Sequence, residues 1–148
     1  MPDRETLERA HEDAAEGKSP STQAGEFVRE EIEHVREGKR GARSAKQAIA
    51  IGLSKARRAG VKLPPPGRSK TSKQTRRKAE LDEQAAKKRH KPSAKRSRAT
   101  EAALKREGRE SVSPRALSRQ SHKAASNRTR KDRSAAAKKA ARARKHRS

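Results

Sequence analysis

The sequence predicts an all-α protein in which a small helical head precedes a largely disordered, conditionally helical basic tail. Eleven of the fifteen apolar residues larger than alanine lie in positions 1–66, and only four lie in the other 82 positions. In the head these side chains recur three or four residues apart, which is the spacing of one helix face. The tail has too few of them to offset its ordering entropy, so we expect one small core, in the head.

The head is expected to begin with two helices. The first, a weak one, runs from about Arg4 to Glu16, with Asp3 as its N-cap and Gly17 as its stop. The second follows the Ser-Pro-Ser-Thr break at 19–22 and ends near position 37. Its apolar face comprises Ala24, Phe27, Val28, Ile32 and Val35, and its other, acidic face comprises Glu26, Glu30, Glu33 and Glu37.

A third helix has the clearest end signals. Ser44 and Gln47 form a capping box, Gly60 stands where a left-handed stop belongs, and Val61 can close the hydrophobic contact beyond it. One stripe of this helix is apolar or small: Ala45, Ala48, Ile49, Gly52, Leu53, Ala56 and Ala59. Because small residues permit close approach, we expect this helix to form an antiparallel hairpin with the second over residues 22–60.

The order of the charges divides the chain into an acidic and a basic part. Positions 1–37 hold eleven acids and five bases, whereas positions 38–148 hold seven acids and 37 bases. Three prolines and a glycine at 64–67 are typical of a linker. We therefore predict a head over residues 1–66, acidic over 1–37 and basic over 38–62, and a disordered Lys-, Arg-, Ala- and Ser-rich tail over 68–148.

The tail nevertheless has local helical potential. The segments with this potential are Ser72 to His90, Ala94 to Glu107, and Arg115 to Ala125, the last capped by Ser113 with Pro114 at its first position. None has a continuous apolar face, and positions 134–148 are of low complexity. Because isolated helices of this length are marginal, we expect fluctuating helicity that a polyanion could consolidate.

Several classes of function are excluded or disfavoured by what the sequence lacks. It has no cysteine, no phosphate-binding glycine motif and no nucleophile motif, so we expect no enzyme, catalytic residue, metal, cofactor or small-molecule substrate. The acids of the head are expected to be solvated and paired with neighbouring arginines. A membrane partner is disfavoured because the tail has no apolar face. The histidines are scattered and expected on the surface: His11, His34, His90, His122 and His146.

The charge balance favours a polyanion as partner. The formal charge is +24, and the tail alone holds 29 bases and seven acids. Each base that neutralises a phosphate releases counterions, which drives non-specific binding. Duplex DNA is favoured over RNA because there is no Tyr or Trp to stack on bases. The alternatives are an RNA-binding or ribosome-associated basic protein, and a protein-interaction module that uses the acidic N-terminal helices.

A sharper candidate site is the glycine-containing segment Gly38–Ser44 at the start of the third helix. Its glycines allow close approach of a phosphate, and the helix start offers amide groups and partial positive charge. The alternative is a flexible basic turn with an ordinary cap. The candidate nucleic-acid-binding residues are Lys39, Arg40, Arg43, Lys46, Arg57, Arg58, Arg76, Arg77, Lys78, Lys87, Lys88, Arg89, Lys95, Arg96, Arg98, Arg128, Arg130, Lys138, Lys139, Arg142, Arg144 and Lys145.

One block of the sequence carries a resemblance. Residues 38–64, GKRGARSAKQAIAIGLSKARRAGVKLP, with the preceding STQAGEFVREEIEHVREGK, resemble the signature of a family of small basic bacterial proteins of unknown function that are often labelled DNA-binding proteins. The tail blocks EAALKREG and ALSRQSHKAA are similar to blocks these proteins share, and the tail composition is similar to that of linker-histone tails. The resemblance implies a bacterial, cytoplasmic protein, associated with the nucleoid if it binds DNA, and implies no mechanism.

Overall fold

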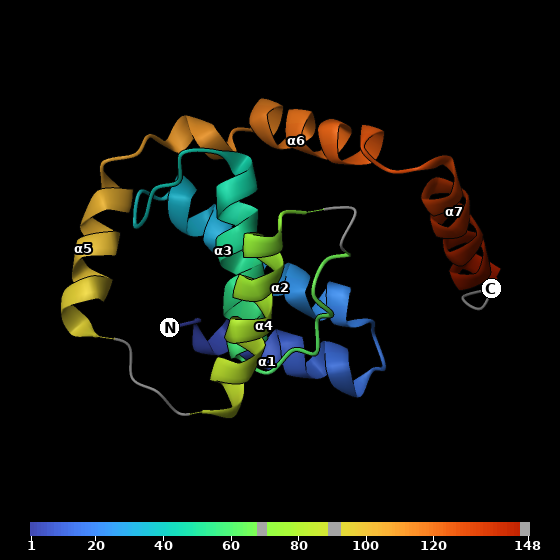
Figure 1. Ribbon diagram of the computed structural model, residues 1–148, viewed down its shortest axis with the longest axis horizontal. Helices are drawn as coiled ribbons and strands as arrows, with labels where there is room; N and C mark the ends of the chain where they lie inside the picture. The colour runs from blue at the N-terminus through green and yellow to red at the C-terminus, as the bar shows by residue number, and fades with distance from the viewer. Residues whose placement is uncertain (68–70, 89–92, 146–148) are drawn as a thin grey trace.

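The computed structural model describes residues 1–67, 71–88 and 93–145, and within these ranges the chain is helical with no strand (Figure 1). The all-α class is therefore confirmed. The helices in chain order are α1 (Arg4–Ala15), α2 (Pro20–Arg36), α3 (Ala45–Arg58), α4 (Lys73–Lys87), α5 (Ala94–Lys105), the short 3₁₀ helix η1 (Arg109–Val112), α6 (Pro114–Ser126) and α7 (Arg130–Lys145).

The centre of the fold is the predicted antiparallel hairpin of α2 and α3. Ala56, near the end of α3, clusters with Ala24, near the start of α2, whereas Ala48 clusters with Val35 at the opposite ends of the two helices. All four are buried. The small residues of the predicted stripe thus face α2, as the spacing indicated.

Two apolar clusters hold the hairpin to its neighbours. The first joins α1, α2 and the end of α3, and its buried members are Ala10, Ala24, Phe27 and Ala56. Gly60 has a φ of +98°, and Val61 and Leu63 after it turn back onto this cluster. The second cluster contains Val35, Ala42, Ala48 and Val112. Because Val112 belongs to η1, the tail contributes to the core, which the composition did not predict.

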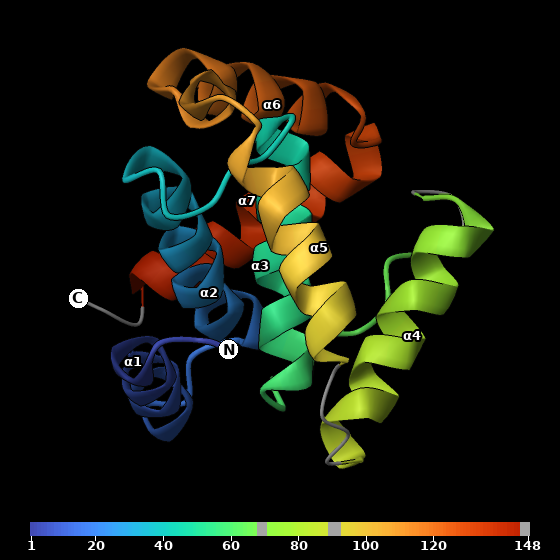
Figure 2. The ribbon, with the colours of Figure 1, turned by 90° about the vertical axis from the view of Figure 1, so that its left-hand side faces the viewer.

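The helices of the tail differ in how they are held. Helix α4 packs on α3 through buried Ala79 and Asp82, and α6 and η1 contact the end of the hairpin where α3 begins. Figure 2 shows α6 across that end and α4 at the side of α3. Within the described residues, α5 and α7 pack against no other helix. The three expected tail helices are present, α7 was not expected, and a disordered tail is not shown.

Local end signals are mostly as predicted. The Ser44 hydroxyl accepts from the backbone N–H of Gln47 at 3.2 Å, but the Gln47 side chain accepts from the N–H of Arg43, at 2.8 Å, rather than from Ser44. In the capping box, the bond to the Gln47 side chain thus comes from Arg43, the residue before the N-cap, and not from Ser44 itself. Asp3 occupies the N-cap of α1, yet its side chain makes no cap bond because its carboxylate turns to His34, 3.0 Å away.

Candidate nucleic-acid interface

The charged groups at the α2–α3 contact decide which basic residues remain available to a ligand. Glu30 is 3% exposed and Glu31 is fully buried. The Lys55 ammonium lies 2.8 Å from Glu30 Oε1 and 2.6 Å from Glu31 Oε2. The expectation that the acids of the head are solvated is therefore wrong at Glu30 and Glu31, because Lys55 of α3 reaches across the hairpin and lies beside both buried carboxylates.

The cluster around Glu30 contains a histidine and a second acid. His34 is 9% exposed, which corrects its expected surface position, and it lies between Asp3 and Glu30. Asp3, Glu30 and His34 present ligand atoms within 4.8 Å of one another, a spacing that can hold a cation. Glu30, however, already accepts from Lys55 and from the N–H of Asp3, at 3.1 Å. The cation that this cluster holds is the Lys55 ammonium.

The pKa of Glu30 reflects its hydrogen bonds with Lys55 and Asp3. Burial is the largest single influence and raises the pKa of Glu30, but the hydrogen bond from Lys55, the N–H of Asp3, the charge of Lys55 and the hydroxyl of Thr6 together outweigh it. The pKa of Glu30 is therefore lowered from its ordinary value. We interpret this cluster as a structural polar core.

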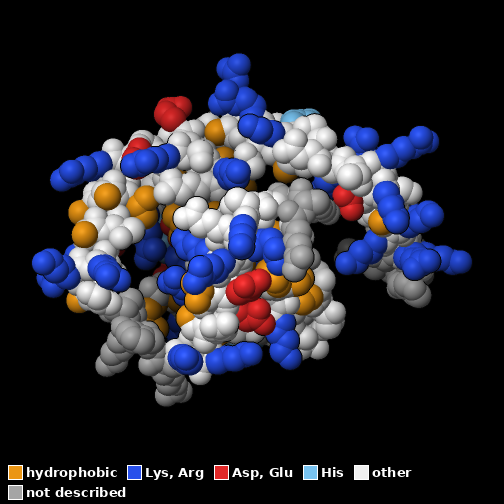
Figure 3. All heavy atoms as spheres, in the orientation of Figure 1, with side chains coloured by type: hydrophobic (Ala, Val, Ile, Leu, Met, Phe, Trp, Pro, Cys, Tyr) orange, Lys and Arg blue, Asp and Glu red, His pale blue; other side chains and the backbone are white. Residues whose placement is uncertain are grey.

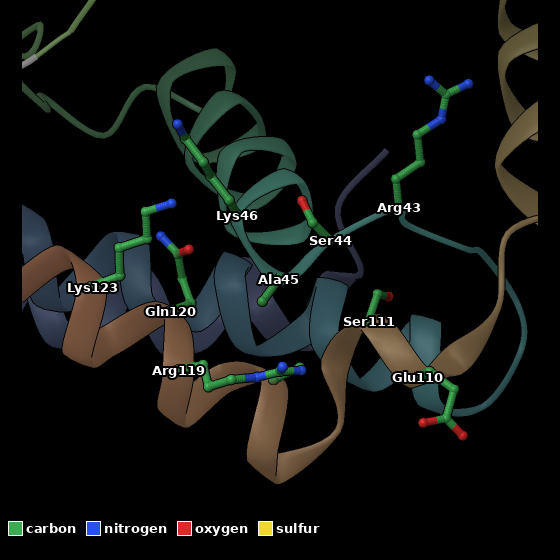
Figure 4. Close-up of a pocket in the computed structure, with 10 residues that line it drawn as sticks. Arg43, Ser44, Ala45, Lys46, Glu110, Ser111, Arg119, Gln120 and Lys123 are labelled. Atoms are coloured by element: carbon green, nitrogen blue, oxygen red, sulfur yellow. The ribbon is translucent and has the colours of Figure 1, made fainter.

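A surface hollow of about 400 Å³ lies where α6 crosses the start of α3, and we call it the α3–α6 pocket. Figure 4 shows Lys46 and Lys123 extending to the same side of it, with Gln120 between them and Arg119 below. Its lining residues are Arg43, Ser44, Ala45, Lys46, Glu110, Ser111, Ala116, Arg119, Gln120 and Lys123.

The chemistry of this pocket suits an anion. It contains the N-terminus of α3, a helix of 14 residues, where the first amides have no acceptor within the helix and carry partial positive charge. Lys46 lies in the first turn of α3, and Arg119 and Lys123 lie one turn apart on α6. No acid among the described residues forms an ion pair with any of these three side chains. The pocket thus combines amide donors with three cations that have no internal counterion.

The loop between α2 and α3 brings the tail to the pocket through close backbone contacts. A Cβ on Gly41 would overlap the carbonyl oxygen of Leu104 and lie 2.7 Å from that of Glu107, so only glycine fits there. Gly38 has a φ of +74° and contacts the guanidinium of Arg109. Together with buried Val112, these contacts place η1, and hence α6, beside the start of α3. Gly38 and Gly41, which were expected to approach a phosphate, therefore contact the tail instead.

Most predicted basic residues of the head have internal acidic partners. Lys39 lies 2.8 Å from Glu37, which raises the pKa of Lys39 through a hydrogen bond and the opposite charge. Arg43 binds a tail carboxylate, that of Glu107, at 2.9 Å. Arg40 lies 4.0 Å from Glu31, and Arg58 lies 2.8 Å from Asp82. The two other predicted residues of the head are Lys46, in the pocket, and Arg57, whose buried Nε has no hydrogen-bond partner among the described residues.

The predicted tail residues are spread over several surfaces rather than gathered in one site. Figure 3 shows Lys and Arg side chains over α4, α6 and α7 on one face of the molecule. Arg76 is 3.9 Å from Glu80, and Arg89 lies outside the described residues, as do His90 and His146. The exposed residues are Arg77, Lys78, Lys87 and Lys88 on or next to α4, Lys95, Arg96 and Arg98 on α5, Arg128 before α7, and Arg130, Lys138, Lys139, Arg142, Arg144 and Lys145 on α7.

Sequence reasoning missed the two α6 cations of the pocket. Arg119 and Lys123 lie in a segment that was predicted as a helix, and their separation of four residues puts them on one face. That spacing was the available signal. It did not single them out because the tail contains many similarly spaced bases, and only the contact with α3 distinguishes this pair.

Comparison with known proteins identifies a family match for part of the chain. Residues 17–67, which include α2, the loop after it and α3, match the model of a family described as a family of unknown function, DUF6496. Searches of curated proteins and of solved structures find no match. None of the described helices has the length and apolar composition needed to cross a bilayer.

Proposed function

We propose that this protein binds duplex DNA without catalysis and with little sequence preference, through contacts to phosphates. The observation that carries the proposal is the α3–α6 pocket, where Lys46, Arg119 and Lys123 lie around the start of α3 and form no ion pair with a described acid. A helix N-terminus and adjacent cations form a binding arrangement for phosphate oxygens. The same partner is supported by the formal charge of +24 and by the resemblance of residues 38–64 to small basic proteins that are often labelled DNA-binding proteins.

The choice of duplex DNA over RNA rests on aromatic content. The only aromatic side chain of Phe, Tyr or Trp type is Phe27, which is fully buried in the α1–α2–α3 cluster. Single-strand and loop recognition rely on stacking against exposed aromatic rings, whereas phosphate contacts to a duplex do not. The proposed partner is therefore the regular backbone of a duplex, as in a nucleoid-associated protein.

The remaining basic helices extend the proposed surface. Helices α5 and α7 pack against no other described helix, although the end of α5 meets the loop at Gly41, so helix packing does not stabilise most of their length. Helices of 12 and 16 residues are marginal alone in water. We propose that these two segments are only conditionally helical in the free protein and become more helical when phosphates neutralise their charge.

The proposal is tested by measuring duplex binding with fluorescence anisotropy. If about 6 to 10 phosphates are contacted, the affinity should fall by roughly 10³- to 10⁵-fold between 50 and 200 mM salt. Scrambling the DNA sequence should change it little. A competitor RNA hairpin and an acidic polypeptide of matched charge should displace the duplex poorly. A flat salt response would contradict DNA binding, and preferential displacement by the RNA would favour an RNA-binding or ribosome-associated protein.

The pocket itself is tested with charge-matched variants. Lys46→Gln, Arg119→Gln and Lys123→Gln together should weaken duplex binding at least about tenfold, since three charge-assisted contacts beside a helix N-terminus are lost. The control removes the same charge from exposed α4 positions by Arg77→Gln, Lys78→Gln and Lys87→Gln, and should weaken binding less. Equal losses in the two variants would mean that binding depends on total charge and not on the pocket.

A further inference from the structure

We propose that Glu107 is a positioning residue that withholds Arg43 from the α3–α6 pocket and so limits the affinity of the pocket for duplex DNA. This inference rests on the proposed function. Arg43 directly precedes the N-cap of α3 and lines the pocket, so it belongs to the set of side chains that a bound phosphate would meet. Its Nε instead donates to Glu107 Oε1 at 2.9 Å.

The orientation of Arg43 differs from that of Lys46 and Lys123. Figure 4 shows Arg43 extending toward the side of α5, away from Lys46 and Lys123. Its side chain is 79% exposed, so nothing except the ion pair requires this direction. Glu110 also lines the pocket, but its carboxylate points away from Ser44 and Lys46 in the same view. Glu107 is thus the described acid that engages a cation of the pocket.

Both ends of the pair are held by backbone contacts. On the Glu107 side, the close approach of Gly41 to the carbonyls of Leu104 and Glu107 fixes the end of α5 against the loop. On the other side, the N–H of Arg43 donates to the side chain of Gln47 at 2.8 Å. Surface ion pairs are usually weak because two flexible side chains must be ordered. Here the backbone segments that carry them are already in place, which favours the pair.

The consequence is a competition for one guanidinium. An arginine paired with a carboxylate is neutralised locally and is directed by that carboxylate, so it attracts a phosphate in the pocket less strongly. Removal of the carboxylate should release Arg43 toward the pocket and add one charge-assisted contact. Because the pair is exposed on the Arg43 side, the effect on affinity should be a few-fold and should decline with salt.

The test is a double-mutant cycle on the full-length protein, with duplex binding measured at 50 mM salt. Glu107→Gln should tighten binding about two- to five-fold, the range expected for an exposed ion pair. The control Glu101→Gln removes the same charge from an exposed position of α5 and should have a smaller effect. Arg43→Gln should weaken duplex binding in both backgrounds, and the loss of affinity should be about two- to five-fold smaller in the parent than in the Glu107→Gln variant. The reason is that Glu107 already withholds Arg43 in the parent.

The outcomes separate this inference from the proposed function. If the parent binds duplex but Glu107→Gln gains no more than Glu101→Gln, or if the gain persists when Arg43 is also replaced, only the inference is overturned. If the parent shows no salt-dependent duplex binding, both the proposed function and this inference are overturned. Thermal unfolding by circular dichroism checks each variant for folding, and Glu107→Asp, which retains the charge, should bind as the parent does.

Discussion

At the scale of single residues, the most consequential feature is the pair of adjacent buried glutamates served by one lysine. Glu30 and Glu31 would each carry a large desolvation cost alone, and Lys55 lies within 2.8 Å of both. Arg40, 4.0 Å from Glu31, connects the loop before α3 to the same cluster. A polar core of this kind specifies which faces of α2 and α3 meet, because another register would leave the carboxylates without a cation.

This cluster predicts loss of stability in acid. The pKa of Glu30 is lowered from 4.5 in the folded protein, so its ionised form stabilises the fold above that pH, and this contribution is lost as the pH falls through the lower folded value. The melting temperature should therefore be level between about pH 5 and 7 and fall below about pH 4.

The variant Glu30→Gln should lose part of that acid dependence, measured as the difference in melting temperature between pH 6 and pH 3. Glu33→Gln, which removes an exposed carboxylate on the same helix, is the control and should retain it. An acid dependence that is identical in Glu30→Gln and in the parent would show that the Glu30–Lys55 contact contributes nothing to it.

At the scale of elements, the closeness of α2 and α3 depends on one glycine, Gly52, in the contact face of α3. A Cβ on Gly52 of α3 would lie 2.6 Å from the Cα of Val28 and 2.9 Å from the carbonyl oxygen of Phe27. Those atoms are backbone, so they can move aside only if the two helices separate. Gly25, also within a helix, has nothing within 4 Å of the same position.

The two glycines therefore predict opposite effects of the same substitution. Gly52→Ala should destabilise the protein by about 1–3 kcal/mol because it forces the helices apart. Gly25→Ala should stabilise it by roughly 0.5–1 kcal/mol because alanine has the higher helix propensity and meets no neighbour. Urea unfolding followed by circular dichroism measures both. Similar shifts for the two variants would reject the close α2–α3 packing.

At the scale of the whole molecule, opposite charges are concentrated in different parts of one chain. The exposed acids of α1 and α2 include Glu8, Glu12 and Glu33, and the exposed bases are concentrated in α4, α5 and α7. Opposite charges within one chain meet at high effective concentration, although each exposed pair contributes only about 0–1 kcal/mol. If the basic helices bind DNA as proposed, the acidic helices should therefore compete weakly with DNA for them.

The variant Glu8→Gln, Glu12→Gln and Glu33→Gln tests this competition. It raises the formal charge from +24 to +27 and leaves the Glu30–Glu31–Lys55 core intact. Duplex affinity should rise several-fold at 50 mM salt, and the gain should shrink as added salt shortens the Debye length. If the acids serve only to fold and solubilise the head, the affinity at low salt will equal that of the parent.

The sequence by itself determined the features that depend on neighbours in the chain. Some features are encoded within a few residues, so local patterns predicted them. They are the helix ends at Ser44 and Gly60, the stripe of small residues on α3 and the helical potential of three tail segments. The concentration of bases after position 38 is equally a property of the sequence, and the expectation of a polyanionic partner follows from it.

Only the tertiary structure decided where the charges and the tail lie. Helical periodicity assigns Glu30 to a polar face, and it cannot show that Lys55, 25 residues away, reaches it in the hairpin. Val112 is one apolar residue in a basic tail, and its burial depends on a space left by Val35, Ala42 and Ala48. The α3–α6 pocket and the Arg43–Glu107 pair join segments more than 60 residues apart. Contacts at such separations depend on the packed shape of the chain, which local periodicity and charge composition do not specify.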